Sequence, residues 1–170
     1  FMDLYNEGYL PEAIVNYLAF LGWSPDSNKE VFSLVELISV FDPSRISKSS
    51  SQYDVKKLNW YNAQYIKKLS LDDYLALVVP FLRDSYDLSD KSDEWISHLA
   101  TIYQSHISYG KQIVDDVKLF FSDDFDMSSE CKEFLLEDGV SLVLSTFKDE
   151  ISAISNWSVD AISLAINNTK

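Results

Sequence analysis

The most regular pattern of apolar and polar positions in the chain lies in residues 53–69. Apolar side chains recur there at intervals of three and four residues, which is the spacing of one buried stripe on a helix. The stripe consists of Leu58, Tyr61, Tyr65, Ile66 and Leu69. Asp54 stands where an N-cap belongs, so we predict a central helix over residues 54–69. The polar positions expected on the free side of this helix are Lys57, Asn62, Lys67 and Lys68.

Before the central helix, the same spacing predicts three shorter helices. Gly8 should end the first of them, and the second should start at Leu10–Pro11, because proline suits the first turn of a helix. Ser27 and Glu30 fit a capping box for the third helix. The apolar face of this third helix is expected to consist of Val31, Leu34, Val35, Ile38 and Phe41.

After the central helix, serines mark most of the predicted helix starts. The starts are expected at Ser70, Ser92, Ser108 and Ser158, with two more helices at about residues 128–137 and 138–155. The side chains expected to face inward are Trp95, Leu99, Ile102 and His106, then Ile113, Val117 and Phe120, and in the last helix Ile162 and Ile166.

The composition favours an all-α fold of two small packed helical modules. Of the 170 residues, 46% are hydrophobic, while only four are Gly and four are Pro, which disfavours a turn-rich β architecture. An acidic linker at residues 86–91 separates two apolar patterns. We therefore expect one module in residues 1–86 and a second in residues 87–170.

Charge is distributed unevenly along the chain. The net charge is −13, yet residues 29–68 hold seven Lys or Arg and four Asp or Glu, a net charge of +3, and the remaining residues carry −16. A polyanion would be attracted to the first region and repelled by the rest. A nucleic acid is therefore a candidate partner of the central helix and its surroundings.

Three stretches of the sequence resemble bacterial glutamyl-tRNA synthetases. Residues 41–69, "FDPSRISKSSSQYDVKKLNWYNAQYIKKL", look like the junction after the catalytic domain of that family, where a Phe-Asp turn leads into a K-L-x-W-x-N-x-x-Y-I-[KR] helix. Residues 8–25, "GYLPEAIVNYLAFLGWSP", are similar to the family's "GYLPEALLNYLALLGW". Residues 147–166, "FKDEISAISNWSVDAISLAI", are similar to its helical anticodon-binding region.

This resemblance implies the stem-contact region and the first helical anticodon-binding module of a glutamate–tRNA ligase, the class I enzyme that attaches glutamate to its tRNA with ATP in protein synthesis. In the family, the nucleotide-binding domain with its HIGH and KMSKR signatures precedes the position of Phe1, and another helical subdomain follows the position of Lys170. We therefore expect a fragment that is inactive alone. ATP and Mg would belong to the catalytic domain outside it.

The residues themselves offer little catalytic chemistry. The run RISKS, residues 45–49, matches the KMSKS phosphate loop only superficially, because no Gly-rich turn or nucleotide domain accompanies it. Cys131 lies between acidic residues that disfavour a thiolate, and no second ligand stands at a metal spacing from His106. We expect no catalytic residue, metal or cofactor in this chain. No apolar run approaches the ~20 residues of a membrane span, and a cytoplasmic monomer is expected.

The resemblance places tRNA contacts around the central helix and the loop before it. The expected tRNA-binding residues are Arg45, Lys48, Lys57, Asn62, Lys67 and Lys68. Glutamate tRNA is the expected partner, and neither DNA nor a membrane is expected. Two alternatives remain open: the cations can be an ordinary solvated surface, and the chain can be an acidic helical protein-interaction module with no RNA role.

Overall fold

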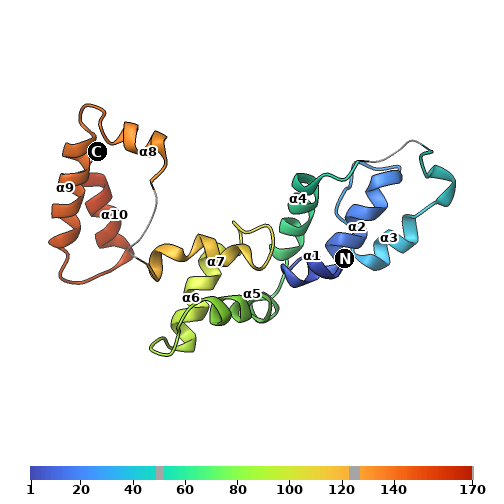
Figure 1. Cartoon of the computed structure of the whole chain (residues 1–170), viewed down its shortest axis with the longest axis horizontal. Coiled ribbons are helices and arrows are strands. Elements are labelled where there is room, and N and C mark those ends of the chain that lie inside the picture. Colours follow the sequence, from blue (N-terminus) through green and yellow to red (C-terminus); the bar gives the residue numbers. More distant parts are fainter. Residues whose placement is uncertain (49–51, 123–126, 170) are drawn as a thin grey trace. The chain divides into compact units, whose positions relative to one another are not determined.

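The computed structural model describes residues 1–48, 52–122 and 127–169, and within these ranges its regular structure is helical only, which confirms the all-α prediction (Figure 1). Up to residue 122 the elements are α1 (Met2–Asn6), α2 (Pro11–Gly22), α3 (Leu34–Val40), the 3-10 helix η1 (Pro43–Arg45), α4 (Val55–Ile66), α5 (Leu71–Ser85), α6 (Asp93–Tyr103), α7 (Gln112–Asp116) and the 3-10 helix η2 (Lys118–Phe120). From residue 127 they are α8 (Ser129–Phe134), α9 (Val140–Ser152) and α10 (Val159–Asn168).

Contacts divide the chain into two compact units, Phe1–Asp123 and Asp124–Lys170. The acidic linker at residues 86–91 lies inside the first unit. The division into functional modules at residues 86 and 87 stays a prediction. Among the described residues, every helix is too short or too polar to cross a bilayer.

The start of the chain follows the sequence prediction. Gly8 ends the first helical segment with φ of +83°, a left-handed conformation that glycine adopts without steric cost. Pro11 is the first residue of α2. Ser70, Ser92 and Ser158 cap α5, α6 and α10 as predicted.

The predicted capping box of the third helix is wrong. α3 starts at Leu34, and its capping box pairs Ser33 with Glu36. The ion pair with Lys29 Nζ, 2.7 Å away, and the hydrogen bond that the Ser33 N–H donates lower the pKa of Glu36 to about 2. The start is shifted because the buried side chain of Asn16 holds the preceding backbone: its Oδ1 accepts from Phe32 N–H at 2.7 Å and its Nδ2 donates to the carbonyl of residue 30 at 2.9 Å.

The shift also changes the inward face of α3. Only Leu37 of this helix is buried. Leu34, Val35 and Ile38, predicted to face the core, are 49%, 78% and 69% exposed. Leu34 and Ile38, together with residues of α2, line an open apolar hollow of about 490 Å³.

One core cluster of the first unit lies between α5, α6 and α7, and another lies between α2 and α4. The buried side chains of the cluster between α5, α6 and α7 include Tyr74, Val78 and Leu82 from α5, Ile96, Leu99 and Ala100 from α6, and Ile113 and Val117 around α7. The prediction that Ile102, His106 and Phe120 face inward is wrong, because all three side chains are exposed. α6 is rotated so that Ile96 and Ala100 take the inward positions, and Tyr74 Oη donates to the Ala100 carbonyl at 2.9 Å. α7 starts four residues later than the predicted Ser108.

In the second unit, α9 and α10 pack against each other. Gly139, with φ of +88°, precedes α9. Among the described residues of this unit only Ala165 is buried, and Ile162 and Ile166, predicted to face inward, are 36% and 44% exposed. A two-helix contact is too small to cover both faces of α10.

Candidate nucleic-acid interface

Hydrogen bonds of the Asp54 side chain and of the Asp54 backbone fix the start of α4. Asp54 Oδ1 accepts from the backbone N–H of Lys56 at 2.9 Å and of Lys57 at 3.2 Å, which satisfies donors that the first turn leaves free. Asp54 N–H donates to Tyr17 Oη of α2 at 2.7 Å. The cap therefore holds the two first-turn lysines in a defined register against α2.

The inner face of α4 packs on α2. Leu58, Tyr61 and Ile66 are fully buried, and Tyr65 is mostly buried with its hydroxyl donating to the Phe32 carbonyl, so the predicted stripe is confirmed. Burial raises the pKa of Tyr65 to about 12 and also raises the pKa of Tyr61. The inner side of α4 is therefore buried and uncharged.

The prediction that Asn62 lies on the free side of the helix is wrong. Its side chain is fully buried. Asn62 Oδ1 accepts from Leu10 N–H at 2.8 Å, and Asn62 Nδ2 donates to the Ser108 carbonyl at 2.6 Å. Each half of the amide thus satisfies a backbone group on a different segment, and the side chain is not available to a base edge.

The outer side of α4 carries the lysines. Lys57, Lys67 and Lys68 are exposed as predicted, and so is Lys56, which the sequence reasoning left out. Lys56 and Lys57 lie in the first turn of α4, Lys67 is its C-cap and Lys68 lies in the turn after it, so the two lysine pairs stand at opposite ends of the helix, eleven residues apart. The spacing was visible in the sequence.

An aromatic side chain stands between these pairs. Trp60 lies opposite the buried stripe, between Lys56 and Lys67 along the helix, and it is 44% exposed. Its ring contacts Tyr61 edge-on, with centroids 5.0 Å apart. The sequence reasoning missed Trp60 as a surface residue, and its position in the middle of four lysines was the available signal.

The two cations before α4 differ from each other. Arg45 forms an ion pair with Asp26, and its Nη2 donates to the Pro25 carbonyl at 3.0 Å, so the guanidinium holds the loop against the turn after α2. Lys48 is exposed. Residues 49–51, which follow Lys48 in the loop before α4, lie outside the described residues.

Among the described residues, no three His, Cys, Asp or Glu side chains lie close enough together to bind a metal ion. Cys131 is exposed on α8. The arrangement on α4 is instead one of positive point charges around an aromatic ring on a rigid helix, which suits contacts with phosphates and with the faces of bases.

Comparison with known proteins also connects this chain with tRNA. The family model "Anticodon binding domain" matches residues 73–169, more than half of the chain. The chain belongs to this anticodon-binding family. A second model, "tRNA synthetases class I (E and Q), catalytic domain", matches residues 1–60. The anticodon-binding match starts in α5, and the catalytic-domain match ends inside α4.

The relatives are glutamate–tRNA ligases. That of Geobacillus stearothermophilus is 44% identical over 98% of this chain and 35% of its own length, and that of Halalkalibacterium halodurans is 41% identical over the whole chain and 36% of its own length. A crystal structure of the glutamate tRNA ligase from Elizabethkingia meningosepticum in complex with its amino acid aligns with a TM-score of 0.71 at 26% identity, covering 97% of this chain and 32% of that one. The chain thus spans about a third of its relatives' length.

The catalytic-domain segment and the anticodon-binding segment meet at a junction of backbone contacts, which we define as residues 7–10, Asn62 and residues 108–111. Gly110 N–H donates to the Gly8 carbonyl at 3.0 Å, and Lys111 N–H donates to the Glu7 carbonyl at 3.1 Å. Lys111 Nζ lies 2.7 Å from Glu7 Oε1, and this contact raises the pKa of Lys111. Asn62, which lies on α4, forms hydrogen bonds with both chain segments of the junction, through Leu10 N–H and the Ser108 carbonyl.

Proposed function

We propose that this chain is the tRNA-binding part of a glutamate–tRNA ligase, in which it contacts the body and anticodon arm of glutamate tRNA. The observation that carries the proposal is the set of exposed lysines at the two ends of α4, Lys56 and Lys57 in its first turn and Lys67 and Lys68 just after its last, on a helix whose inner face is buried and fixed. Membership of the anticodon-binding family supports the same partner. The whole enzyme would join glutamate to tRNA with ATP and Mg in the cytoplasm, with the nucleotide bound outside this chain.

The contribution of this part is positional. A lysine is a point charge without the bidentate fork of arginine, so the α4 lysines would fix the position of phosphates and leave base identity unread. Holding the tRNA in register places its acceptor end at a distant reaction centre, which raises the rate by orientation. The acidic remainder of the chain repels RNA and restricts where it can lie.

The predicted tRNA-binding residues then separate into two groups. We propose that Lys57, Lys67, Lys68 and the neighbouring Lys56 contact phosphates directly, with Lys48 extending the same surface. Arg45 and Asn62 are proposed to act through the protein: Arg45 holds the loop before α4, and Asn62 holds the junction. Their loss would weaken tRNA binding by displacing the lysines.

A second candidate function has one observation in its favour. The second unit exposes large apolar side chains, among them Leu136 at 85% and Leu142 at 70%. With the acidic charge around them, they suit a basic protein partner. An acidic interaction module would bind that partner and show no salt-dependent affinity for tRNA, so one binding assay separates the two functions.

The experiment is a salt titration of binding to transcribed glutamate tRNA. Each neutralised phosphate contributes about 0.7 to 0.9 to the slope of log affinity against log salt. We expect Lys57→Ala and Lys68→Ala each to lower the slope by nearly one unit, with helix content unchanged. Lys132→Ala, which removes an exposed lysine between Glu130 and Glu133 on α8, is the matched control and should leave the slope unchanged. Equal slopes for all variants would contradict the proposal.

A further inference from the structure

The helices of the first unit pack in two groups. Over the described residues, α2 packs with α3 and α4, while α5 packs with α6 and α7. The first group lies mostly in the segment that the catalytic-domain model matches, and the second lies mostly in the segment that the anticodon-binding model matches. The junction of residues 7–10, Asn62 and residues 108–111 joins the two groups.

Side chains cross the junction in both directions. Leu10 packs against the core cluster of α5, α6 and α7, and Tyr109 packs against the core cluster of α2 and α4. The rings of Tyr9 and Tyr109 stack, with centroids 5.2 Å apart and planes within 7° of parallel. Tyr9 Oη also donates to Asn59 Oδ1 on α4. Each group thus contributes a side chain to the core of the other, and neither can shift without losing close packing.

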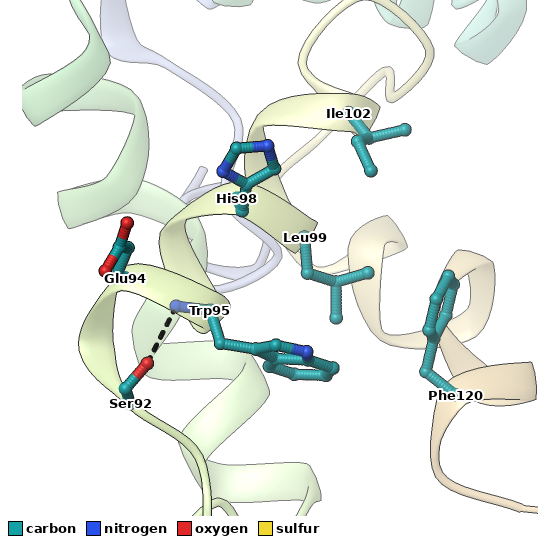
Figure 2. A pocket seen from close by; sticks show the side chains of 7 residues that line it. All are labelled: Ser92, Glu94, Trp95, His98, Leu99, Ile102 and Phe120. Atoms are coloured by element: carbon teal, nitrogen blue, oxygen red, sulfur yellow. Dashed lines mark hydrogen bonds between the residues drawn. The ribbon is translucent and has the colours of Figure 1, made fainter. Parts of the chain in front are cut away.

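Each group also carries a surface that solvent reaches. On the first group this surface is the set of exposed lysines at the two ends of α4. On the second group it is the outer face of α6, where Figure 2 shows Trp95, Leu99 and Phe120 beside an open hollow of about 430 Å³. Because the two surfaces lie on different groups, their separation depends on the junction.

We propose that the junction is a positioning device, in which Tyr109 and Lys111 hold the two groups at one separation so that a single tRNA contacts both surfaces at once. This inference rests on the proposed function, because the tRNA spans the two surfaces. Neither residue touches the RNA. A tRNA held at one surface meets the other at a high effective concentration, and this gain falls when the two surfaces can move apart. A fixed junction also removes the entropy cost of ordering the groups at binding.

The test variant combines Tyr109→Ala with Glu7→Gln, which removes the ring stack and the ion pair with Lys111 but keeps every lysine. Binding of the full chain would be measured to glutamate tRNA, to its isolated anticodon stem-loop, and to the same tRNA without the anticodon arm. We expect the affinity for whole tRNA to fall about 10-fold or more, with the affinities for the two parts unchanged. Removal of a negative charge alone would strengthen RNA binding, so a loss separates positioning from charge.

Two further variants serve as controls. Tyr109→Phe keeps the stacked ring and should bind whole tRNA like the wild type. Tyr5→Ala combined with Glu12→Gln makes the same two chemical changes at exposed positions outside the junction, and it should also bind like the wild type. If the junction variant does not fold, Glu7→Gln alone, a change at the surface, should still weaken binding of whole tRNA by about 2-fold.

Amide hydrogen exchange reports whether the junction has opened. The Gly110 and Lys111 N–H groups donate to the Gly8 and Glu7 carbonyls, so their exchange should become faster in the junction variant and stay unchanged in the control. Unchanged exchange in the junction variant would show that the two side chains do not hold the junction, and would contradict the inference.

Three binding results would also overturn it. They are a wild-type chain that binds whole tRNA no more tightly than the better of the two parts, a junction variant that binds whole tRNA like its control, and an equal loss of affinity for one part alone. If Lys57→Ala and Lys68→Ala flatten the salt slope while the junction variant behaves like its control, the proposed function stands and the positioning role fails. A wild-type chain that binds no tRNA removes both.

Discussion

Replacing Gly8 with alanine is expected to lower the free energy of unfolding of the first unit by about 2–5 kcal/mol. Two costs combine. At φ of +83° an L residue is strained by about 1–2 kcal/mol. The added Cβ would also lie 2.7 Å from both N and Cα of Gly110, and a clash with backbone cannot be relieved by a rotamer change, so the junction must open at a further cost of about 1–3 kcal/mol.

The comparison variants separate these two costs. Gly139→Ala places alanine at φ of +88° with nothing within 4 Å of the new Cβ, so it should show the backbone strain alone, in the second unit. Gly22→Ala has neither problem and should be neutral or stabilising by up to about 1 kcal/mol. Urea unfolding followed by circular dichroism measures all three. A Gly8→Ala protein as stable as the wild type would contradict the close contact at Gly110.

Asn62→Ala is expected to cost about 2–6 kcal/mol of unfolding free energy. The substitution leaves Leu10 N–H and the Ser108 carbonyl without their partner in a buried place, and each unsatisfied group costs about 1–3 kcal/mol. Lys67→Ala, an exposed change near the end of the same helix, should stay within about 0.5 kcal/mol of the wild type. Thermal and urea unfolding of the two variants give the comparison.

The same pair of variants tests the role of Asn62 toward RNA. A residue that reads a base edge would, when removed, reduce the preference for cognate over non-cognate tRNA and leave stability unchanged. We expect the opposite result: lower stability, with the preference intact at temperatures where the variant is folded. Loss of preference at full stability would restore Asn62 as a base-reading residue.

The central helix was predictable because its signals are local. Asp54 caps a first turn that follows it directly, and the apolar stripe from Leu58 to Leu69 repeats over about three turns. Asn62 was misplaced although the period itself contains the answer: it stands four residues after Leu58 and four before Ile66, and therefore on the buried stripe. Because the side chain is polar, we predicted that it faces solvent. Its hydrogen-bond partners, Leu10 N–H and the Ser108 carbonyl, lie 52 and 46 residues away in the sequence.

The start of α3 could not be predicted for a related reason. Ser27 and Glu30 form a plausible capping box on their own. What prevents a helix there is Asn16, which lies on another helix and takes up the backbone groups of residues 30 and 32. The sequence offers no sign of that contact. The exposed lysines of the candidate site could be predicted, because they depend on the local pattern of α4. The contacts of Asn16 and Asn62 that support the site could not, because they join segments far apart in the sequence.

The central claim, that RNA lies on the outer face of α4, is tested most directly by lysine footprinting. The chain would be acetylated with and without glutamate tRNA, and modification of each lysine would be read by mass spectrometry. We predict that tRNA protects Lys56, Lys57, Lys67 and Lys68 and leaves Lys132 and Lys148 as reactive as in the free protein. Protection of Lys132 and Lys148 with the α4 lysines fully reactive, or no protection at saturating tRNA, would contradict the account.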